Sequence, residues 1–156
     1  MVYSEHMRQP TRIRQHGFTS IELVLIAVVI CVLLALVVTT RAGVRQNERN
    51  TERQRDVKEL RNGLEAYFAQ YNRYPTLKDV NDPRWRDTNM KPIGGDVFRD
   101  PSGMDDRLAD KPAQRVYAYT ATTASGTACN EKDPCTQYSL TATLEGGGSY
   151  VKNSLN

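Results

Sequence analysis

The chain has 156 residues, of which 39% are hydrophobic and 25% are charged, with 21 lysines and arginines against 18 aspartates and glutamates. Most of the basic excess lies in residues 1–17, which hold three arginines and one glutamate, so the charge balance gives no argument for nucleic-acid binding. Both histidines, His6 and His16, lie there too, so the rest of the chain lacks the residue needed for Ser-His-Asp and Cys-His catalysis. The spacing of the acidic residues does not indicate a catalytic pair. We therefore expect that the protein is not an enzyme.

An apolar run follows this basic segment. Sixteen consecutive apolar residues extend from Leu23 to Val38, and the run reaches back to Phe18 with Glu22 as its one charge. These 21 residues would form a helix of about 31 Å, close to the hydrocarbon thickness of a bilayer. A secretory signal has a shorter apolar region and a small-residue cleavage site, whereas this run ends VVTTRAGVR. The sequence therefore predicts one transmembrane helix over residues 18–40.

Glu22 is an unusual residue for a membrane span, because an ionised carboxylate in hydrocarbon costs about 2.5–3.5 kcal/mol. A cut after Gly17 would create an amine at Phe18, one helical turn from the carboxylate, and the same amine of a neighbouring helix could lie level with it. A desolvated pair of opposite charges offsets the cost that either charge has alone. Glu22 would then set the register between adjacent subunits.

The same residues resemble a known family. A basic leader followed by GFTSIE at residues 17–22 and a long apolar run is similar to the prepilin signature of type IV pilins and type II secretion pseudopilins. In that family a membrane aspartyl peptidase cuts after the glycine and methylates the new amine of the phenylalanine, and the glutamate takes part in filament assembly. The resemblance therefore implies that residues 1–17 are a leader peptide, that Phe18 is N-methylated, and that Glu22 is an assembly residue. Ser20 stands where the family often has leucine, which leaves the processing residues intact.

We expect the helix to continue over residues 41–74 as an amphipathic segment. No proline occurs between Phe18 and Tyr74. Apolar residues recur there at helical spacing: Val57, Leu60, Leu64, Tyr67, Phe68 and Tyr71. Four arginines recur every four residues with acids close by: Arg41, Arg45, Arg49 and Arg53. We expect them to form a solvated face of weak ion pairs; the alternative is a contact surface for neighbouring subunits. The end of the segment, DVKELRNGLEAYFAQYNRYPT, is similar to the helix end and YPT turn of G-type pseudopilins and many short pilins.

The second half of the chain changes character. Residues 75–114 are rich in proline, glycine and aspartate, which indicates a connection with short ordered pieces. Within residues 115–156, the segments 115–122 and 137–145 alternate as strands do, and a third strand is expected near Tyr150. The pattern does not decide which face of the first strand is buried. The sequence predicts an α+β pilin fold, in which a long N-terminal helix packs on a small antiparallel sheet of three or four strands.

Two cysteines, Cys129 and Cys135, lie in the loop between the two clearest strands. Disulfides can form in a segment that is exported from the cytoplasm, and a disulfide stabilises a small domain, so we expect this pair to be bonded. A metal site is the weaker alternative, because two cysteines without histidine supply too few ligands. The resemblance to G-type pseudopilins raises a calcium site as a candidate at four acids: Asp96, Asp100, Asp105 and Asp106. Their spacing does not match a D-x-[DN]-x-[DN]-G loop, so we interpret them as solvated turn residues and expect no other cofactor.

Three functions fit these features. The preferred one is a structural subunit of a type IV pilus-like filament for surface motility, adhesion or DNA uptake, a homopolymer made by a prepilin peptidase and a filament assembly machinery. Such a subunit is a single-pass protein of the cytoplasmic membrane as precursor, then part of an extracellular filament or a periplasmic pseudopilus. A pseudopilin of a type II secretion-like machine is the alternative within the family. A signal-anchored surface binding domain that never polymerises is the alternative outside it.

Overall fold

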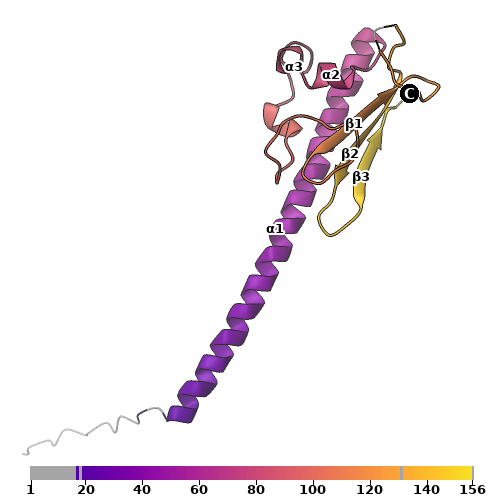
Figure 1. Ribbon diagram of the computed structural model, residues 1–156. Coiled ribbons are helices and arrows are strands. Elements are labelled where there is room, and N and C mark those ends of the chain that lie inside the picture. Colours follow the sequence, from indigo (N-terminus) through magenta and orange to yellow (C-terminus); the bar gives the residue numbers. More distant parts are fainter. Residues whose placement is uncertain (1–16, 18, 131, 156) are drawn as a thin grey trace, which may run out of the picture. The chain divides into compact units, whose positions relative to one another are not determined.

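The computed structural model of the chain describes residues 17, 19–130 and 132–155, and only the backbone of residues 38–42. Its elements in chain order are α1 (Ser20–Tyr71), α2 (Leu77–Val80), α3 (Pro83–Asn89), the 3-10 helix η1 (Gly95–Phe98), β1 (Tyr117–Thr122), β2 (Gln137–Thr143) and β3 (Ser149–Asn153) (Figure 1). The chain divides into two compact units, Met1–Arg41 and Ala42–Asn156, and the second is called the head below. The predicted α+β pilin-like fold is confirmed, with three strands in the described part of the sheet.

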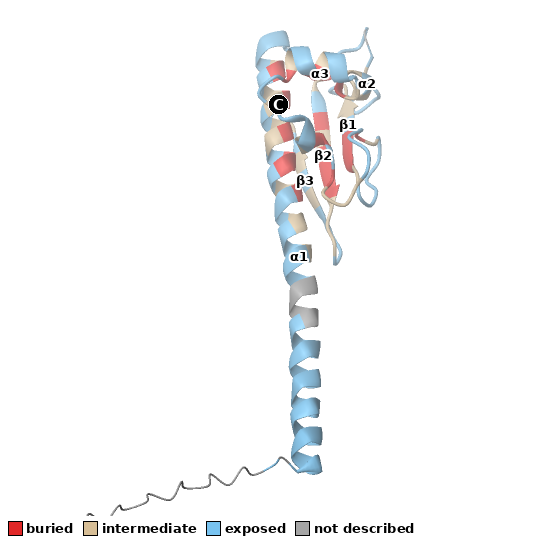
Figure 2. Cartoon of the chain, turned by 90° about the vertical axis from the view of Figure 1, so that its left-hand side faces the viewer, coloured by how far each residue is buried: buried red, intermediate tan, exposed pale blue. Residues whose placement is uncertain are grey.

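In the first unit, α1 contains a segment that is long and apolar enough to cross a membrane, Ser20–Val37. None of its side chains is buried, and Ile21 and Leu23 are 68% and 62% exposed (Figure 2). The helix satisfies its own backbone hydrogen bonds, while its apolar side chains have no apolar surface against them within the described residues. A bilayer or a bundle of other helices is the environment that such a segment requires.

In the head, one face of α1 packs on the sheet (Figure 2). The predicted apolar stripe is buried at Val57, Leu60, Leu64 and Tyr67, whereas Tyr71 at its end is 45% exposed. The helix ends at Tyr71 because Asn72 adopts the left-handed conformation, with φ of 54°, in which asparagine is one of the few residues readily accepted.

The sheet is antiparallel throughout, in the order β1-β2-β3. Tyr119 of β1 pairs with Leu140 of β2, and Leu140 pairs with Lys152 of β3. The inner face presents buried residues to α1: Tyr117, Tyr119, Tyr138, Leu140 and Ala142. This register shows that the tyrosine face of β1 is the buried one.

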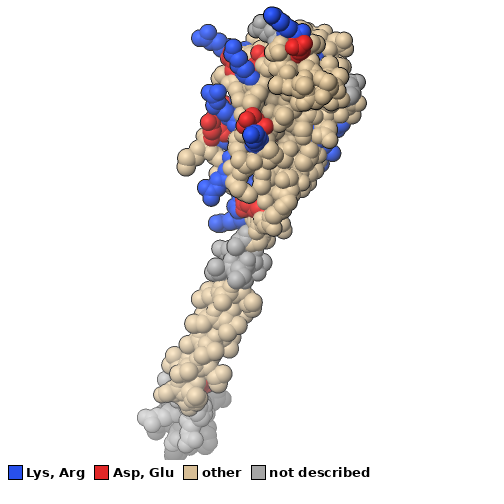
Figure 3. All heavy atoms as spheres, turned by 45° about the vertical axis from the view of Figure 1, so that its right-hand side comes forward, with Lys and Arg blue, Asp and Glu red and all other residues tan. Residues whose placement is uncertain are grey.

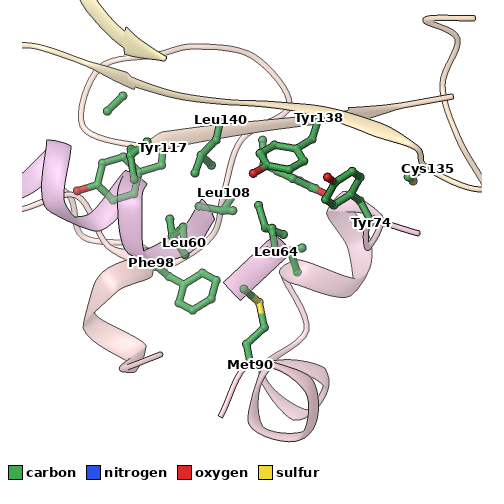
Figure 4. Close-up of a cluster of buried hydrophobic side chains, with 14 residues drawn as sticks. Leu60, Leu64, Tyr74, Met90, Phe98, Leu108, Tyr117, Cys135, Tyr138 and Leu140 are labelled. Carbon is green, nitrogen blue, oxygen red and sulfur yellow. The ribbon is translucent and has the colours of Figure 1, made fainter. Parts of the chain in front are cut away.

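The connection between helix and sheet completes the core (Figure 4). Met90, Phe98 and Leu108 come from this connection and are 2–4% exposed. Gly63 lets the connection approach α1, because a Cβ there would overlap the side chains of Ile93 and Met90. The glycine of the helix motif therefore serves close packing rather than a bend.

Candidate assembly site

The candidate processing and assembly residues lie at the start of α1. Glu22 is exposed in the first helical turn, where a negative charge is favoured by the helix dipole, and its backbone N–H lies 3.4 Å from the Oγ1 of Thr19. Gly17 is also exposed, whereas Phe18 lies outside the described residues. Within the described part of the chain the Glu22 carboxylate has no ion pair. Any ionic partner of this carboxylate therefore lies outside the described residues or on another molecule.

Arg53, one of the four arginines that recur along α1, is buried in the head. Arg53 and Asp100 are each 1% exposed at the side chain, and Arg53 donates from Nε to Oδ2 of Asp100 at 2.6 Å and from Nη2 to Oδ1 at 2.9 Å. The expectation of a solvated arginine face is wrong at this position. A two-pronged pair satisfies both groups and so makes their burial tolerable.

Arg49, one turn earlier, is paired with Glu145 at the turn between β2 and β3. Its Nε lies 2.7 Å from Oε1 and its Nη2 lies 2.5 Å from Oε2 of the carboxylate. Arg53 also approaches Glu145, at 3.0 Å, and Asn50 exchanges two hydrogen bonds with the Glu145 backbone. These donors, Arg49 first, lower the pKa of Glu145 to about 2. The network holds the β2–β3 turn and the Asp100 loop on α1.

A further buried acid, Asp56, faces the first strand. The hydroxyl of Tyr117 donates to Oδ2 of Asp56 at 2.8 Å. Burial raises the pKa of Asp56, and the Tyr117 hydrogen bond opposes that change. Burial and the neighbouring carboxylate also raise the pKa of Tyr117, so the hydroxyl stays a donor.

Glu65 joins three parts of the head. Its Oε2 accepts from the hydroxyl of Tyr74 at 2.9 Å, and its Oε1 accepts from the hydroxyl of Tyr138 at 2.8 Å and from the backbone N–H of Leu155 at 3.3 Å. Tyr74 is the first residue of the YPT turn, and the carbonyl of Pro75 accepts from the Tyr119 hydroxyl at 2.7 Å. The turn, the sheet and the C-terminal segment are thus fixed to one carboxylate.

The predicted disulfide is present between Cys129 and Cys135, whose Cα atoms are 5.1 Å apart. Cys135 is buried, and its carbonyl accepts from the backbone N–H of Tyr74 at 2.8 Å. The disulfide loop therefore supports the YPT turn directly. Cys31, in the apolar segment, is free and exposed.

The four calcium candidates do not form a common site. Asp100 is held by Arg53, and Asp106 lies 2.9 Å from Nη1 of Arg86. Asp105 accepts from the backbone N–H of Arg107 at 3.1 Å, and Asp96 lies 3.6 Å from Arg99. Among the described residues, no three His, Cys, Asp or Glu side chains are grouped so as to hold a metal ion.

The chain is 35% identical over 69 residues to the type II secretion system core protein G of Aeromonas hydrophila. The chain is similar to a pseudopilin. The match covers 44% of this chain and 48% of that protein, so the chain spans about half the length of the relative. No family model matches the chain, and no solved structure matches it.

The helical spacing of apolar residues in α1 predicted the hydrophobic core. It did not predict the hydrogen bonds and ion pairs that polar side chains of α1 make with the rest of the head. Arg53, Asp56 and Glu65 are the helix residues that the sequence did not assign to a buried role. One signal was available, because Arg49, Arg53 and Asp56 extend the buried apolar face toward the N-terminus at helical spacing. Their partners lie 47 to 96 residues away in the chain and carry no such periodicity.

Proposed function

We propose that the chain is a prepilin-type precursor whose mature form, beginning at Phe18, is a structural subunit of a filament drawn from the membrane. One observation carries the proposal: the apolar segment Ser20–Val37 is exposed throughout, and it begins within the GFTSIE motif of residues 17–22. The subunit has no catalytic role in this proposal. Its partners are further copies of itself, a prepilin peptidase and an assembly machinery in the cytoplasmic membrane.

Assembly in this proposal transfers the apolar segment from lipid to a bundle of like segments. Once the bundle has left the membrane, its dissociation would expose these side chains to water at a cost of about 0.8 kcal/mol per methylene, so the bundled state holds together without covalent bonds. The carboxylate of Glu22 pairs with the N-terminal amine of a neighbouring copy, and the pair sets the axial register. The head forms the outer surface of the filament.

Of the two filament types, the proposal favours a pseudopilus of a type II secretion-like machine. The similarity to core protein G supports this choice, whereas the YPT turn is shared by pseudopilins and many short pilins and does not separate the two. A surface pilus for motility, adhesion or DNA uptake is the second candidate, which the Cys129–Cys135 disulfide favours. Filaments of cell-length scale on the surface at native expression would decide for the pilus.

The test is the intact mass and N-terminal sequence of the protein recovered from cell membranes and from sheared surface material. A chain that begins at N-methylated Phe18 supports prepilin processing. A chain that begins at Met1, or beyond residue 40, contradicts it and favours a signal-anchored or secreted domain. Substitution of Gly17 by a bulky residue should leave a full-length precursor and serves as the matched control for the mass assay.

A further inference from the structure

The strand β3 forms an edge of the sheet that no described segment covers. The order of the sheet is β1-β2-β3, so β3 has β2 on one side and no strand on the other (Figure 1). The outer edge of β1 is different, because Ala109 and Ala128 form bridges there to Ala118 and Thr122. Among the described residues, β3 is therefore the strand with an open edge.

The register of β3 shows which of its backbone groups are unpaired. The N–H of Ser154 donates to the carbonyl of Tyr138 at 3.0 Å, and the carbonyl of Gly148 accepts from the N–H of Leu144 at 3.0 Å. In an antiparallel pair, successive residues turn their backbone groups toward the partner strand and away from it in alternation. Three residues of β3 therefore turn their N–H and C=O groups away from β2: Ser149, Val151 and Asn153. Such a row of groups can pair with an added strand.

Two basic side chains near this edge have no acidic partner. Lys152 is the one charged residue in the three described strands, and Figure 3 shows a broad surface of the head without charged side chains. The Nζ of Lys152 lies 5.3 Å from the ring centre of Tyr150. Arg61 of α1 has a buried Nε without a hydrogen-bond partner in the described part of the chain. Neither cation forms an ion pair with a described residue.

Arg61 and Lys152 lie at the same level of the head. Glu65 accepts from the hydroxyl of Tyr138, which places this turn of α1 beside that residue of β2. Four residues along a helix span about 6 Å, and two residues along a strand span about 7 Å. The turn that carries Arg61 therefore lies beside the next inward-facing pair of the sheet, Leu140 and Lys152. The open edge thus has two cations on its α1 side.

We infer that the open edge of β3 is a docking surface for an extended acidic segment of another protein, which adds to the sheet as a further strand. The added strand lies about 4.8 Å from β3, and its alternate side chains stand beside Tyr150 and Lys152. Glutamate or aspartate at those positions supplies the anion that Lys152 and Arg61 lack. The inference goes beyond the proposed function, because no contact within a filament enters into it.

A second copy of this chain is the less suitable occupant. The β1 edge of a copy is covered by its own residues, and its β3 edge carries the same Lys152 and Arg61. Two such edges side by side would bring like charges together, which opposes pairing. The same lysine therefore disfavours pairing between copies and favours an acidic strand.

A designed peptide tests the docking surface. The probe is a short fluorescein-labelled peptide in which glutamate and valine alternate, so that all acids lie on one face of the extended chain. Its binding to the detergent-solubilised full-length protein is followed by fluorescence anisotropy. The unaltered chain should bind it saturably, and the peptide with lysine in place of glutamate should bind about tenfold more weakly. Absence of saturable binding, or equal binding of the two peptides, would overturn the inference.

Val151→Pro tests the backbone pairing. Proline removes an N–H that faces away from β2, and edge strands accept proline at such positions. The variant should bind the acidic peptide about tenfold more weakly, whereas Val151→Thr, which keeps the N–H, should bind within about twofold of the unaltered chain. Urea unfolding followed by the fluorescence of Trp85 shows whether each variant is folded. A folded Val151→Pro chain that binds as well as Val151→Thr would exclude strand addition.

N-methylation of the peptide tests the same pairing without altering the protein. The described sheet is antiparallel throughout, and in an antiparallel addition the valine amides of the peptide face β3 while the glutamate amides face solvent. Methylation of the valine amides should therefore abolish binding, and methylation of the glutamate amides should leave it. Equal binding of the two methylated peptides would contradict strand addition.

Removal of charge tests the two cations. Lys152→Gln and Arg61→Gln should each weaken binding of the acidic peptide about threefold, and the double variant about tenfold, as expected for exposed ion pairs. Lys78→Gln, at an exposed position of α2, is the matched control and should not change binding. If Lys152→Gln and Arg61→Gln also leave binding unchanged, the docking surface does not select acidic segments and the inference fails. These measurements do not depend on cleavage before Phe18, so their failure leaves the proposed function in place.

Discussion

The hydroxyl of Tyr138 on β2 donates a hydrogen bond of 2.8 Å to Oε1 of Glu65 on α1. The same carboxylate accepts from Tyr74 in the YPT turn, so helix, turn and sheet depend on one part-buried polar contact. Tyr138 is 3% exposed, and its burial and the Glu65 contact raise its pKa, which keeps it a donor at any physiological pH.

Tyr138→Phe should lower the free energy of unfolding of the head by about 1.5–3 kcal/mol, the net value of a hydrogen bond to a charged acceptor. Urea unfolding of the detergent-solubilised full-length chain, followed by the fluorescence of Trp85, measures it; Trp85 is the one tryptophan and lies 5.0 Å from Tyr67 between ring centroids. Tyr71→Phe is the control, because Tyr71 is 45% exposed. Equal effects of the two substitutions would show that the Glu65 contact contributes nothing.

Arg53→Met should be much more harmful than Arg55→Met. The first leaves Asp100 buried without its cation, at a cost of about 3–5 kcal/mol, whereas the second removes an arginine that is 71% exposed. Arg53→Met with Asp100→Asn should recover a large part of the loss, because no uncompensated charge is then buried. Urea unfolding of the unaltered chain, Arg53→Met, Asp100→Asn and the double variant gives the coupling energy, and strict additivity would count against a coupled pair.

These two sites mark the limit of what the sequence predicts. The stripe of Val57, Leu60 and Leu64 was predictable, because apolar side chains at helical spacing must face a common core. Period-two alternation predicted β2 in the same way. Arg53 was assigned to solvent because an arginine among acids on a helix usually is solvated, and only the distant Asp100 makes its burial tolerable.

The N-terminal residues differ in kind from the buried ones. The signature at residues 17–22 gives roles to Gly17, Phe18 and Glu22 through resemblance, while one isolated chain has no neighbour to pair with the Glu22 carboxylate. The role of Glu22, which would lie between subunits, is therefore inferred from a sequence motif. The roles of Arg53 and Glu65 inside the head are inferred from the contacts that these side chains make.

Glu145→Gln should change how the stability of the head depends on pH. The pKa of Glu145 is lowered from 4.5 to about 2 in the folded chain, so its stabilising effect is complete above about pH 4.5 and is lost as the pH falls toward 2. At pH 7 the variant should be less stable by about 1 kcal/mol, the upper value for a partly exposed pair. Asp56, whose pKa is raised, is common to both proteins and cancels in the comparison. Urea titrations between pH 2 and pH 7 should show the difference closing in acid; a constant difference would argue against ionic stabilisation.

Removal of the disulfide should loosen the YPT turn. The bond closes a loop with a sequence separation of six residues, and a loop this short contributes about 2 kcal/mol by chain entropy. Cys129→Ala with Cys135→Ala should lower stability by that amount and speed proteolysis between residues 123 and 136. Cys31→Ala is the control and should leave both unchanged, since Cys31 is free and exposed. Equal protease resistance with and without the disulfide would show that the Tyr74 to Cys135 hydrogen bond holds the loop alone.

Glu22→Ala should leave a membrane protein that is cut normally and does not assemble. Removal of the carboxylate makes membrane insertion easier, by about 2.5–3.5 kcal/mol on insertion scales, so loss of assembly could not be ascribed to failed insertion. Glu22→Gln keeps the side-chain size and tests the charge, and Ser20→Ala, in the same helical turn, is the matched control that should assemble. Membrane fractions, N-terminal mass and cross-linked multimers are measured for each variant. If Glu22→Gln assembled as well as the unaltered chain, an ionic role for Glu22 would be excluded, and the exposed apolar residues of Ser20–Val37 alone would have to drive association.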